Sequence, residues 1–193
     1  MQTDAPRQQL RMIWPSRRLA DPPPLRLHPD YDLRTYRPGD EPAWVAVMGL
    51  AGFHGWDDER LAVLKAMILP DGWFFITHRA TGNVVATALA NHRPHALHPF
   101  GGELGWVAGD PAHKGKRLGW TVCAAVTRRF LSAGYQNIYL LTDDERLPAL
   151  ATYLKLGYEP FLYAPDMARR WEAICSQVNW PFTPDAWPNN PPD

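Results

Sequence analysis

The sequence predicts an α/β (α+β) domain, because runs typical of strands and of helices alternate through the middle of the chain. The length of 193 residues suits one domain with a sizeable core and leaves room for extensions at its ends. Prolines concentrate in residues 1–42 and 160–192, away from the alternating segment. We therefore expect a proline-rich N-terminal arm over residues 1–30, one domain over residues 31–163, and a C-terminal helix and proline-rich tail over residues 164–193.

The arm over residues 1–30 is expected to lack regular structure. It contains six prolines, each of which fixes φ and removes a backbone donor. Its apolar triplet Met12-Ile13-Trp14 can still pin the arm to the domain.

The domain is expected to begin with a strand, a turn and two helices. Apolar and β-prone residues over 33–36 indicate the strand, and Arg37-Pro38-Gly39-Asp40 turns the chain into a helix over 41–50. Asp57 or Asp58 can cap the second helix, which carries Leu61, Leu64, Met67 and Ile68 on one face until Pro70-Asp71-Gly72 ends it.

A β-hairpin and further alternating elements complete the domain. The turn Ala80-Thr81-Gly82-Asn83 joins strands over 73–78 and 84–90, and a polar loop follows. The later elements are a strand over 103–109, a helix over 118–133, a strand over 137–141, a helix over 147–156, a strand over 158–163 and a helix over 166–178.

Charge and cysteine content exclude several classes of protein. The 20 basic and 20 acidic residues balance, so neither a nucleic acid nor a membrane is an expected partner. The two cysteines, Cys123 and Cys175, are too few for a disulfide framework and have no zinc-ligand spacing. Residues 1–10 have no apolar stretch of the kind found in signal peptides, and no run reaches the roughly 18–20 apolar residues that a membrane span needs. We therefore expect a soluble cytoplasmic protein.

The stretch from Trp106 to Gly119 predicts a strand that passes through a glycine-containing turn directly into a helix. Backbone N–H groups at a helix N-terminus carry partial positive charge and can hold a pyrophosphate, with three basic side chains of the turn nearby. Glycines at 115 and 119 allow close approach. The alternative is that the turn needs glycine only for its geometry and that its lysines are solvated.

Residues 114–119 resemble the R/Q-x-x-G-x-G/A cofactor motif of the GNAT superfamily of N-acetyltransferases. Lys114 stands where arginine or glutamine is usual, and Arg117 replaces the first motif glycine, whereas Gly119 keeps the last position. If residue 117 has ordinary helical angles, its backbone N–H can still donate to a phosphate. Its side chain can then point away from the turn or pair with a phosphate oxygen. If the position needs φ > 0, binding is expected to suffer.

A second segment resembles the family's N-x-x-A-x-x-L-Y-x-x-x-G-F signature, through Ala149, Tyr153, Leu156, Gly157 and Tyr158. The sequence departs from it at Arg146, Thr152 and Tyr158, in place of asparagine, leucine and phenylalanine. With the earlier hairpin, the resemblance covers about residues 33–163. It implies a GNAT-like fold: a mixed central sheet of about six to seven strands flanked by helices, in which strands 103–109 and 137–141 form a parallel pair splayed at one end.

The resemblance also implies acetyl-CoA as cosubstrate and a set of binding residues. They are Val107, Ala108, Gly109, Lys114, Gly115, Lys116, Arg117, Leu118 and Gly119. The first three are expected to pair with the cofactor rather than with a neighbouring strand, and the N–H of Val107 is expected to stabilise the oxyanion.

Two residues are candidates for catalysis. Tyr153 matches the family tyrosine that protonates the leaving thiolate, although periodicity equally allows a packed aromatic on an amphipathic helix. Glu103 lies where the histone-acetyltransferase branch carries its general base, and partial burial can raise its pKa, although a glutamate at a strand end is commonly just solvated.

Three other groups of residues have structural interpretations. His92, His95 and His98 are evenly spaced, but nearby prolines break any helix that would align them, so no metal site is expected. Residues 143–145 are acidic and can attract an amine, but capping of the following helix is the preferred interpretation. The tryptophans at 44, 56, 73 and 106 can wall an acceptor pocket or fill the core.

Together these observations predict an N-acetyltransferase that moves an acetyl group from acetyl-CoA to a primary amine by direct transfer in a ternary complex. The acceptor is a small-molecule amine or a protein amine that the sequence does not identify, and the protein is expected to be a monomer or a homodimer. The alternative is a catalytically weak or inactive GNAT-like module that binds CoA or regulates.

Overall fold

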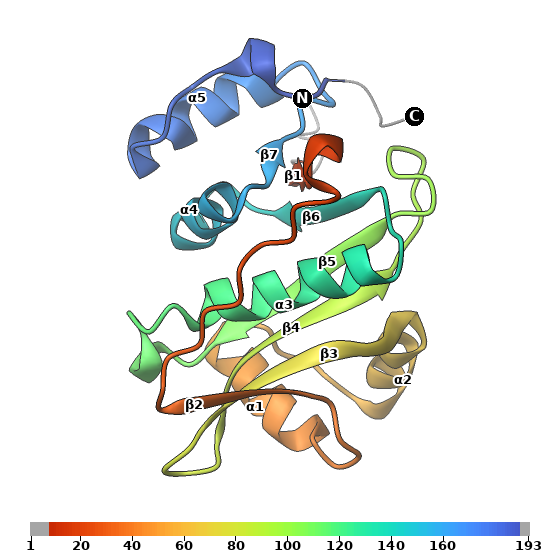
Figure 1. The fold of residues 1–193 in the computed structure, drawn as a ribbon, viewed down its shortest axis with the longest axis vertical. Coiled ribbons are helices and arrows are strands. Elements are labelled where there is room, and N and C mark those ends of the chain that lie inside the picture. Colours follow the sequence, from red (N-terminus) through yellow and green to blue (C-terminus); the bar gives the residue numbers. More distant parts are fainter. Residues whose placement is uncertain (1–7, 190–193) are drawn as a thin grey trace, which may run out of the picture.

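A computed structural model describes residues 8–189, and a seven-stranded mixed sheet forms its centre (Figure 1). The strand order is β2-β3-β4-β5-β6-β1-β7. The strands are β1 (Leu10–Ile13), β2 (Tyr31–Thr35), β3 (Ile68–His78), β4 (Val84–His92), β5 (Gly102–Gly109), β6 (Ile138–Thr142) and β7 (Glu159–Pro160). The α-helices are α1 (Glu41–Leu50), α2 (Asp58–Met67), α3 (Leu118–Ser132), α4 (Leu147–Leu156) and α5 (Met167–Val178). This architecture confirms the predicted fold class.

Helices cover both faces of the sheet and enclose two apolar clusters. Helix α3 crosses one face, and α1 and α2 lie on the other (Figure 1). Val122, Val126 and Phe130 recur at four-residue spacing on α3 and are fully buried against the sheet. Trp44 and Met48 of α1 are equally buried in the cluster on the opposite face.

The predicted hairpin is confirmed, because β3 and β4 pair antiparallel on either side of the turn at residues 79–83. Asp57 caps α2 as expected, accepting a hydrogen bond from the Arg60 N–H at 2.8 Å. The expected end of this helix is wrong, because Ile68 is already extended and begins β3. The register shift between Ile68 and Trp73 and the left-handed Asp71 show that residues 68–72 form a bulged strand rather than a helix end.

The expectation that the arm lacks regular structure is wrong for Leu10–Ile13, which form β1 between β6 and β7. The prolines at 6 and 15 leave the intervening residues free to donate backbone hydrogen bonds, and Leu10 and Met12 are completely buried. The boundaries at residues 30 and 163 stay a prediction, although residues of both end segments enter the core.

The expected final strand over 158–163 is shorter than predicted, because β7 contains only Glu159 and Pro160. The Tyr158 N–H caps the end of α4 by bonding to the Tyr153 carbonyl, and Pro160 has no N–H to donate. Helix α5 forms as predicted and buries Met167, Trp171 and Ile174.

The parallel pair β5–β6 is confirmed, and its pairing stops in the middle of β5. The paired residues run only from Gly102–Ile138 to Leu104–Leu140. Beyond them Trp106 adopts a φ of 49°, and both Trp106 and Val107 stand opposite one residue of β4, because Leu89 pairs with Gly105 and Thr87 pairs with Ala108. This β-bulge turns the second half of β5 away from β6. Ala108 and Gly109 still pair with β4, so the expectation that they pair with no neighbouring strand is wrong.

Candidate active site

A groove of about 630 Å³ lies at the N-terminal end of α3, and we call it the α3 groove. Its walls come from the end of β5, the turn at residues 110–117, the first turn of α3 and one face of α4. Among the described residues no side chain caps α3, so its first-turn N–H groups have there neither an intrahelical acceptor nor a capping side chain. An added Cβ at Gly115 or Gly119 would meet nothing within 4 Å. The helix end therefore faces open space that an anion can enter.

Arg117 immediately precedes α3 and has φ 58° and ψ 25°, the left-handed conformation. The resemblance places a glycine at this position, and the observed angles are those that glycine adopts most easily. The sequence-based alternative of ordinary helical angles is therefore wrong. An arginine that adopts these angles still leaves the following N–H groups pointing into the α3 groove, at a conformational cost of roughly 1–2 kcal/mol.

Seven of the nine predicted cofactor residues line the α3 groove: Val107, Gly109, Lys114, Gly115, Arg117, Leu118 and Gly119. Ala108 does not, because its side chain is buried among α1 residues on the other face of the sheet. Lys116 is exposed and lies outside the lining.

The sequence interpretation missed two basic residues of the α3 groove, Arg26 and Lys155. The Thr121 hydroxyl of α3 donates to the Arg26 carbonyl and holds this part of the arm beside the groove, a long-range contact without a local sequence signal. Lys155 had a signal, because Pro148, Thr152 and Lys155 recur at helical spacing and share one face of α4.

A second cavity of about 310 Å³ lies on the other side of the bulged strand, and we call it the Glu103 cavity. Its lining includes Phe53, Arg93, Glu103, Trp106, Asp143 and Arg146. Val107 and Tyr153 line both this cavity and the α3 groove. The two spaces therefore meet at these two residues, where β5 separates from β6.

Glu103 is 6% exposed, so it is not a solvated strand-end glutamate. Its Oε2 accepts a hydrogen bond from Nη1 of Arg93 at 2.8 Å and lies 3.4 Å from the Tyr139 hydroxyl. An added Cβ at Gly105 would lie 3.3 Å from Oε1, so the glycine leaves room for the carboxylate. A buried carboxylate with one cationic partner still has lone pairs for a proton or a ligand.

Tyr153 is 5% exposed and lies on α4 between the two spaces. Burial raises the pKa of its hydroxyl well above the ordinary value, and the neighbouring Cys123 adds to this effect. Within residues 8–189, its hydroxyl has no hydrogen-bond partner. Tyr153 is therefore a neutral proton donor whose hydroxyl is not committed to a structural bond.

The acidic segment 143–145 does not cap α4, so that interpretation is wrong. The N-cap residue is Arg146, and no side chain accepts from the helix end. Asp143 instead accepts from Nε2 of Gln9 at 3.0 Å and pairs with Arg146 at 3.3 Å, and Asp144 pairs with Arg170. The two carboxylates are therefore used in contacts with Gln9, Arg146 and Arg170 and not at the helix end.

The four tryptophans mostly fill the core. Trp44 packs edge-on against Trp56 and Trp73, with ring centroids 4.5 and 5.4 Å apart. Of the four, only Trp106 lines the Glu103 cavity. Phe53, which the sequence interpretation missed, also lines this cavity. The Cζ atom of Arg146 lies 4.5 Å from the centre of the Phe53 ring.

The three histidines have separate surroundings. His92 bonds to the Tyr135 hydroxyl at 2.7 Å, and His98 stacks on Tyr139 with centroids 3.9 Å apart. Across the described residues, the acidic, histidine and cysteine side chains form no group of three that could hold a metal. In the same part of the chain, no helix is both long and apolar enough to cross a membrane.

The sequence matches a family model described as the acetyltransferase (GNAT) family over residues 32–158. The mycothiol acetyltransferase of Catenulispora acidiphila is 32% identical over 77% of this chain and 51% of that protein. The mycothiol acetyltransferase of Saccharomonospora viridis is 32% identical over 71% of this chain and 48% of that protein. The chain thus spans about half the length of the curated relatives it matches.

Solved structures share the fold at lower identity. A GCN5-related N-acetyltransferase from Sphaerobacter thermophilus superimposes with a TM-score of 0.63 at 21% identity, covering 80% of this chain and 49% of that one. The glucosamine-6-phosphate N-acetyltransferase of Arabidopsis thaliana has a TM-score of 0.53 at 19% identity, covering 66% of this chain and 90% of that one.

Proposed function

The chain belongs to the acetyltransferase (GNAT) family, and on that premise we propose that it transfers an acetyl group from acetyl-CoA to a primary amine within a ternary complex. One observation carries this proposal: the α3 groove and the Glu103 cavity meet at Val107 and Tyr153. Direct transfer needs two binding spaces whose reacting ends touch. The remaining residues of each space fit a different substrate.

The α3 groove fits the phosphates of acetyl-CoA. Its uncapped helix end supplies N–H donors, and Gly115 and Gly119 leave space for close approach. Arg26, Lys114, Arg117 and Lys155 add positive charge around the same groove. In this proposal the phosphates lie at the start of α3 and the pantetheine arm follows the edge of β5 that no longer pairs with β6 toward Val107.

The Glu103 cavity fits an amine. In this proposal the Glu103 carboxylate accepts the proton that makes the amine nucleophilic. Its burial beside Arg93 fixes its position and limits its contact with water. Asp143 supplies a second carboxylate that attracts a cationic substrate to the same cavity.

Two groups at the junction complete the chemistry. Acetyl-CoA supplies an activated acetyl thioester. We assign the Val107 N–H to the oxygen that gains negative charge during transfer, because this residue lines both spaces. We assign the uncommitted Tyr153 hydroxyl to protonation of the departing thiolate, and its raised pKa keeps the proton in place until that step.

We infer that the acceptor is a small molecule, because the Glu103 cavity is small, at about 310 Å³, and the side chains of Phe53, Trp106 and Arg146 narrow it. The curated relatives support this choice, since they are mycothiol acetyltransferases. The other acceptor predicted from the sequence, a protein amine, stays a prediction. The same holds for the oligomeric state, monomer or homodimer, and for the cytoplasmic location.

Calorimetry with acetyl-CoA and a thiol-release assay over a panel of amines test this function together. We expect saturable acetyl-CoA binding and amine-dependent release of CoA thiol. Binding without release for any amine supports the alternative of a CoA-binding module without turnover. The absence of acetyl-CoA binding contradicts both functions.

A further inference from the structure

A third cavity, of about 480 Å³, adjoins the Glu103 cavity and has no role in the chemistry described so far. It lies between β1, the loop that follows β4 and the segment that follows β7. Arg11, His95 and Tyr163 line it, and we call it the Arg11 cavity. Gln9 and Leu141 line both it and the Glu103 cavity, so the two spaces are adjacent.

The guanidinium of Arg11 lacks polar partners. Its Nε and Nη1 atoms are buried and have no hydrogen-bond partner in the part of the chain that the structure describes. The group lies 5.2 Å from the centre of the Tyr163 ring, an interaction that leaves the N–H donors unused. Nη2 is not among these buried atoms, so it is the nitrogen through which the unpaired positive charge of Arg11 reaches the cavity and can attract an anionic ligand.

His95 adds a second donor to the Arg11 cavity. Its Nδ1 accepts the Leu97 N–H at 3.1 Å, so the neutral ring carries its proton on Nε2. Partial burial, and then the positive charges of Arg11 and Arg93, lower the pKa of His95. None of the described residues that line this cavity is acidic, so nothing within the lining offsets these cations.

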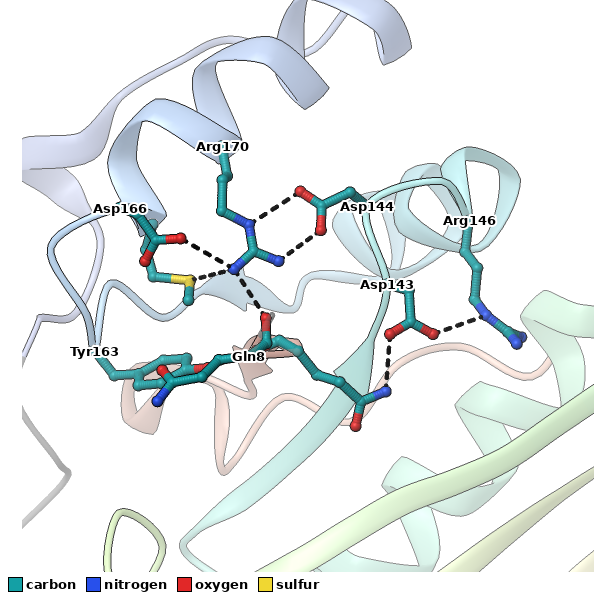
Figure 2. Close-up of polar contacts among 9 residues, drawn as sticks. Gln8, Asp143, Asp144, Arg146, Tyr163, Asp166 and Arg170 are labelled. Atoms are coloured by element: carbon teal, nitrogen blue, oxygen red, sulfur yellow. Dashed lines mark hydrogen bonds and ion pairs between the residues drawn. The ribbon is translucent and has the colours of Figure 1, made fainter. Parts of the chain in front are cut away.

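Polar contacts fix the walls of the Arg11 cavity. The Tyr163 hydroxyl donates to the Gln9 carbonyl at 2.6 Å, and Nη1 of Arg170 donates to the Gln8 carbonyl at 2.9 Å. Figure 2 shows Arg170 between Gln8, Asp144 and Asp166. Through these contacts Arg170 connects α5 with the segment before β1 and with the turn before α4. A ligand therefore meets walls that are already ordered, which reduces the entropy cost of binding.

We propose that the Arg11 cavity is an anion subsite for the amine acceptor. A carboxylate or phosphate group accepts hydrogen bonds from Nη2 of Arg11, the guanidinium nitrogen that is not among the buried atoms, and from Nε2 of His95, while the amine of the same molecule reaches Glu103. The inference rests on the proposed function and narrows it. The acceptor class becomes small molecules that carry both a primary amine and an anionic group.

Anion binding tests the subsite without turnover. Calorimetric titrations of the whole chain with inorganic phosphate and with acetate compare the wild type, Arg11→Met and the control Arg169→Met, which removes an exposed arginine from α5. Removal of a charge-assisted hydrogen-bond donor to an anion weakens binding of that anion by about ten- to a hundredfold. We expect that loss for Arg11→Met and none for the control, and the preferred anion identifies the group.

Two outcomes overturn the subsite: no saturable binding of either anion by the wild type, or equal binding by Arg11→Met. If Arg11→Met does not fold, His95→Ala replaces it, because His95 lies on an exposed loop. We expect this variant to bind the preferred anion several-fold more weakly, and unchanged binding overturns the proposal.

A turnover assay provides a second test of the subsite. Amines of matched size, with and without an anionic group, are compared in the thiol-release assay. We expect Arg11→Met to raise KM about tenfold or more for the anionic amine only. An equal change for both amines contradicts the subsite. If no amine is acetylated, the proposed function fails, and the anion titrations still decide the subsite separately.

Discussion

Tyr139, Tyr153 and Tyr158 are all at most 5% exposed, but of the three only Tyr153 lines the two spaces, and their hydroxyls differ. The Tyr139 hydroxyl donates to the Arg93 carbonyl at 2.7 Å, and that of Tyr158 bonds to Thr127 at 2.9 Å. Among the described residues, nothing bonds to the hydroxyl of Tyr153. The Tyr153 Oη is not one of the buried polar atoms without a partner, so it is open to the space that its side chain lines, whereas the hydroxyls of Tyr139 and Tyr158 are used in structural bonds. This accessible hydroxyl supports the acid role.

The proposed base predicts a loss of activity in Glu103→Gln. The amide keeps the shape of the side chain but does not take up the amine proton. We expect kcat/KM to fall about 10²- to 10⁴-fold. The affinity for acetyl-CoA, measured by calorimetry, is expected to stay the same because Glu103 lies outside the α3 groove.

Asp143→Asn is the matched control, because it neutralises the other carboxylate of the Glu103 cavity. We expect its effect on kcat to be small. Equal losses of kcat in the two variants, or full activity of Glu103→Gln, contradict the assignment of the base.

At the scale of elements, two backbone features create the α3 groove. The bulge at Trp106 separates the end of β5 from β6, and left-handed Arg117 directs the chain into an uncapped α3. Both residues have positive φ without being glycine, a conformation that is uncommon and tends to mark functional sites. The departure of Arg117 from the family motif thus lies in its side chain and not in the backbone.

Arg117→Gly separates the conformational cost from the phosphate contact. Relief of the left-handed arginine is expected to raise the free energy of unfolding by about 1 kcal/mol, measured by urea denaturation. Loss of the guanidinium from the α3 groove is expected to weaken acetyl-CoA binding several-fold. Lys116→Ala, outside the groove lining, serves as control. Unchanged or tighter binding by Arg117→Gly shows that the arginine makes no phosphate contact.

Sequence periodicity and turn chemistry predicted most elements from α1 to α5, including the hairpin, and the family resemblance implied the parallel pair. They missed β1, because four residues between prolines show no pattern until β6 and β7 pair with them. They also missed the bulge at Trp106, since only the register of β4 reveals it. Arg26 and Phe53 reach the site through tertiary contacts, which no local spacing encodes.

At the scale of the whole molecule, the two chain ends complete the core. Strand β1 extends the sheet, and Trp171 and Trp187 pack against each other from the C-terminal segment. His98 is fully buried beside β6, and Nε2 of its ring has no partner within residues 8–189. Burial and the charge of Arg11 lower the pKa of His98 to about 4.

The lowered pKa of His98 predicts that folding stability falls in mild acid. The unfolded chain binds the histidine proton first, near its ordinary pKa of 6.5, so this contribution is complete above pH 6.5 and is lost as the pH falls toward about 4. The full effect is roughly 3 kcal/mol. Urea denaturation at about pH 7.5 and about pH 4.5 measures it.

His98→Phe isolates this effect, because the ring can still stack on Tyr139 while the titrating group is removed. Both proteins keep the same carboxylates, so their common pH dependence cancels in the comparison. We expect the variant to lose less stability than the wild type between the two pH values. Equal losses contradict the role of His98.

The central claim is that the α3 groove and the Glu103 cavity meet at a tyrosine that protonates the leaving thiolate, and Tyr153→Phe tests it most directly. Tyr158→Phe is the matched control, since it removes a buried hydroxyl that bonds only to Thr127. Single-turnover thiol release at saturating acetyl-CoA and amine, together with calorimetric Kd values for acetyl-CoA, measures both variants. We predict a fall in the rate of about 10²-fold or more for Tyr153→Phe, with unchanged Kd and a nearly normal rate for Tyr158→Phe. An unchanged rate for Tyr153→Phe would contradict the claim and assign this tyrosine to the core.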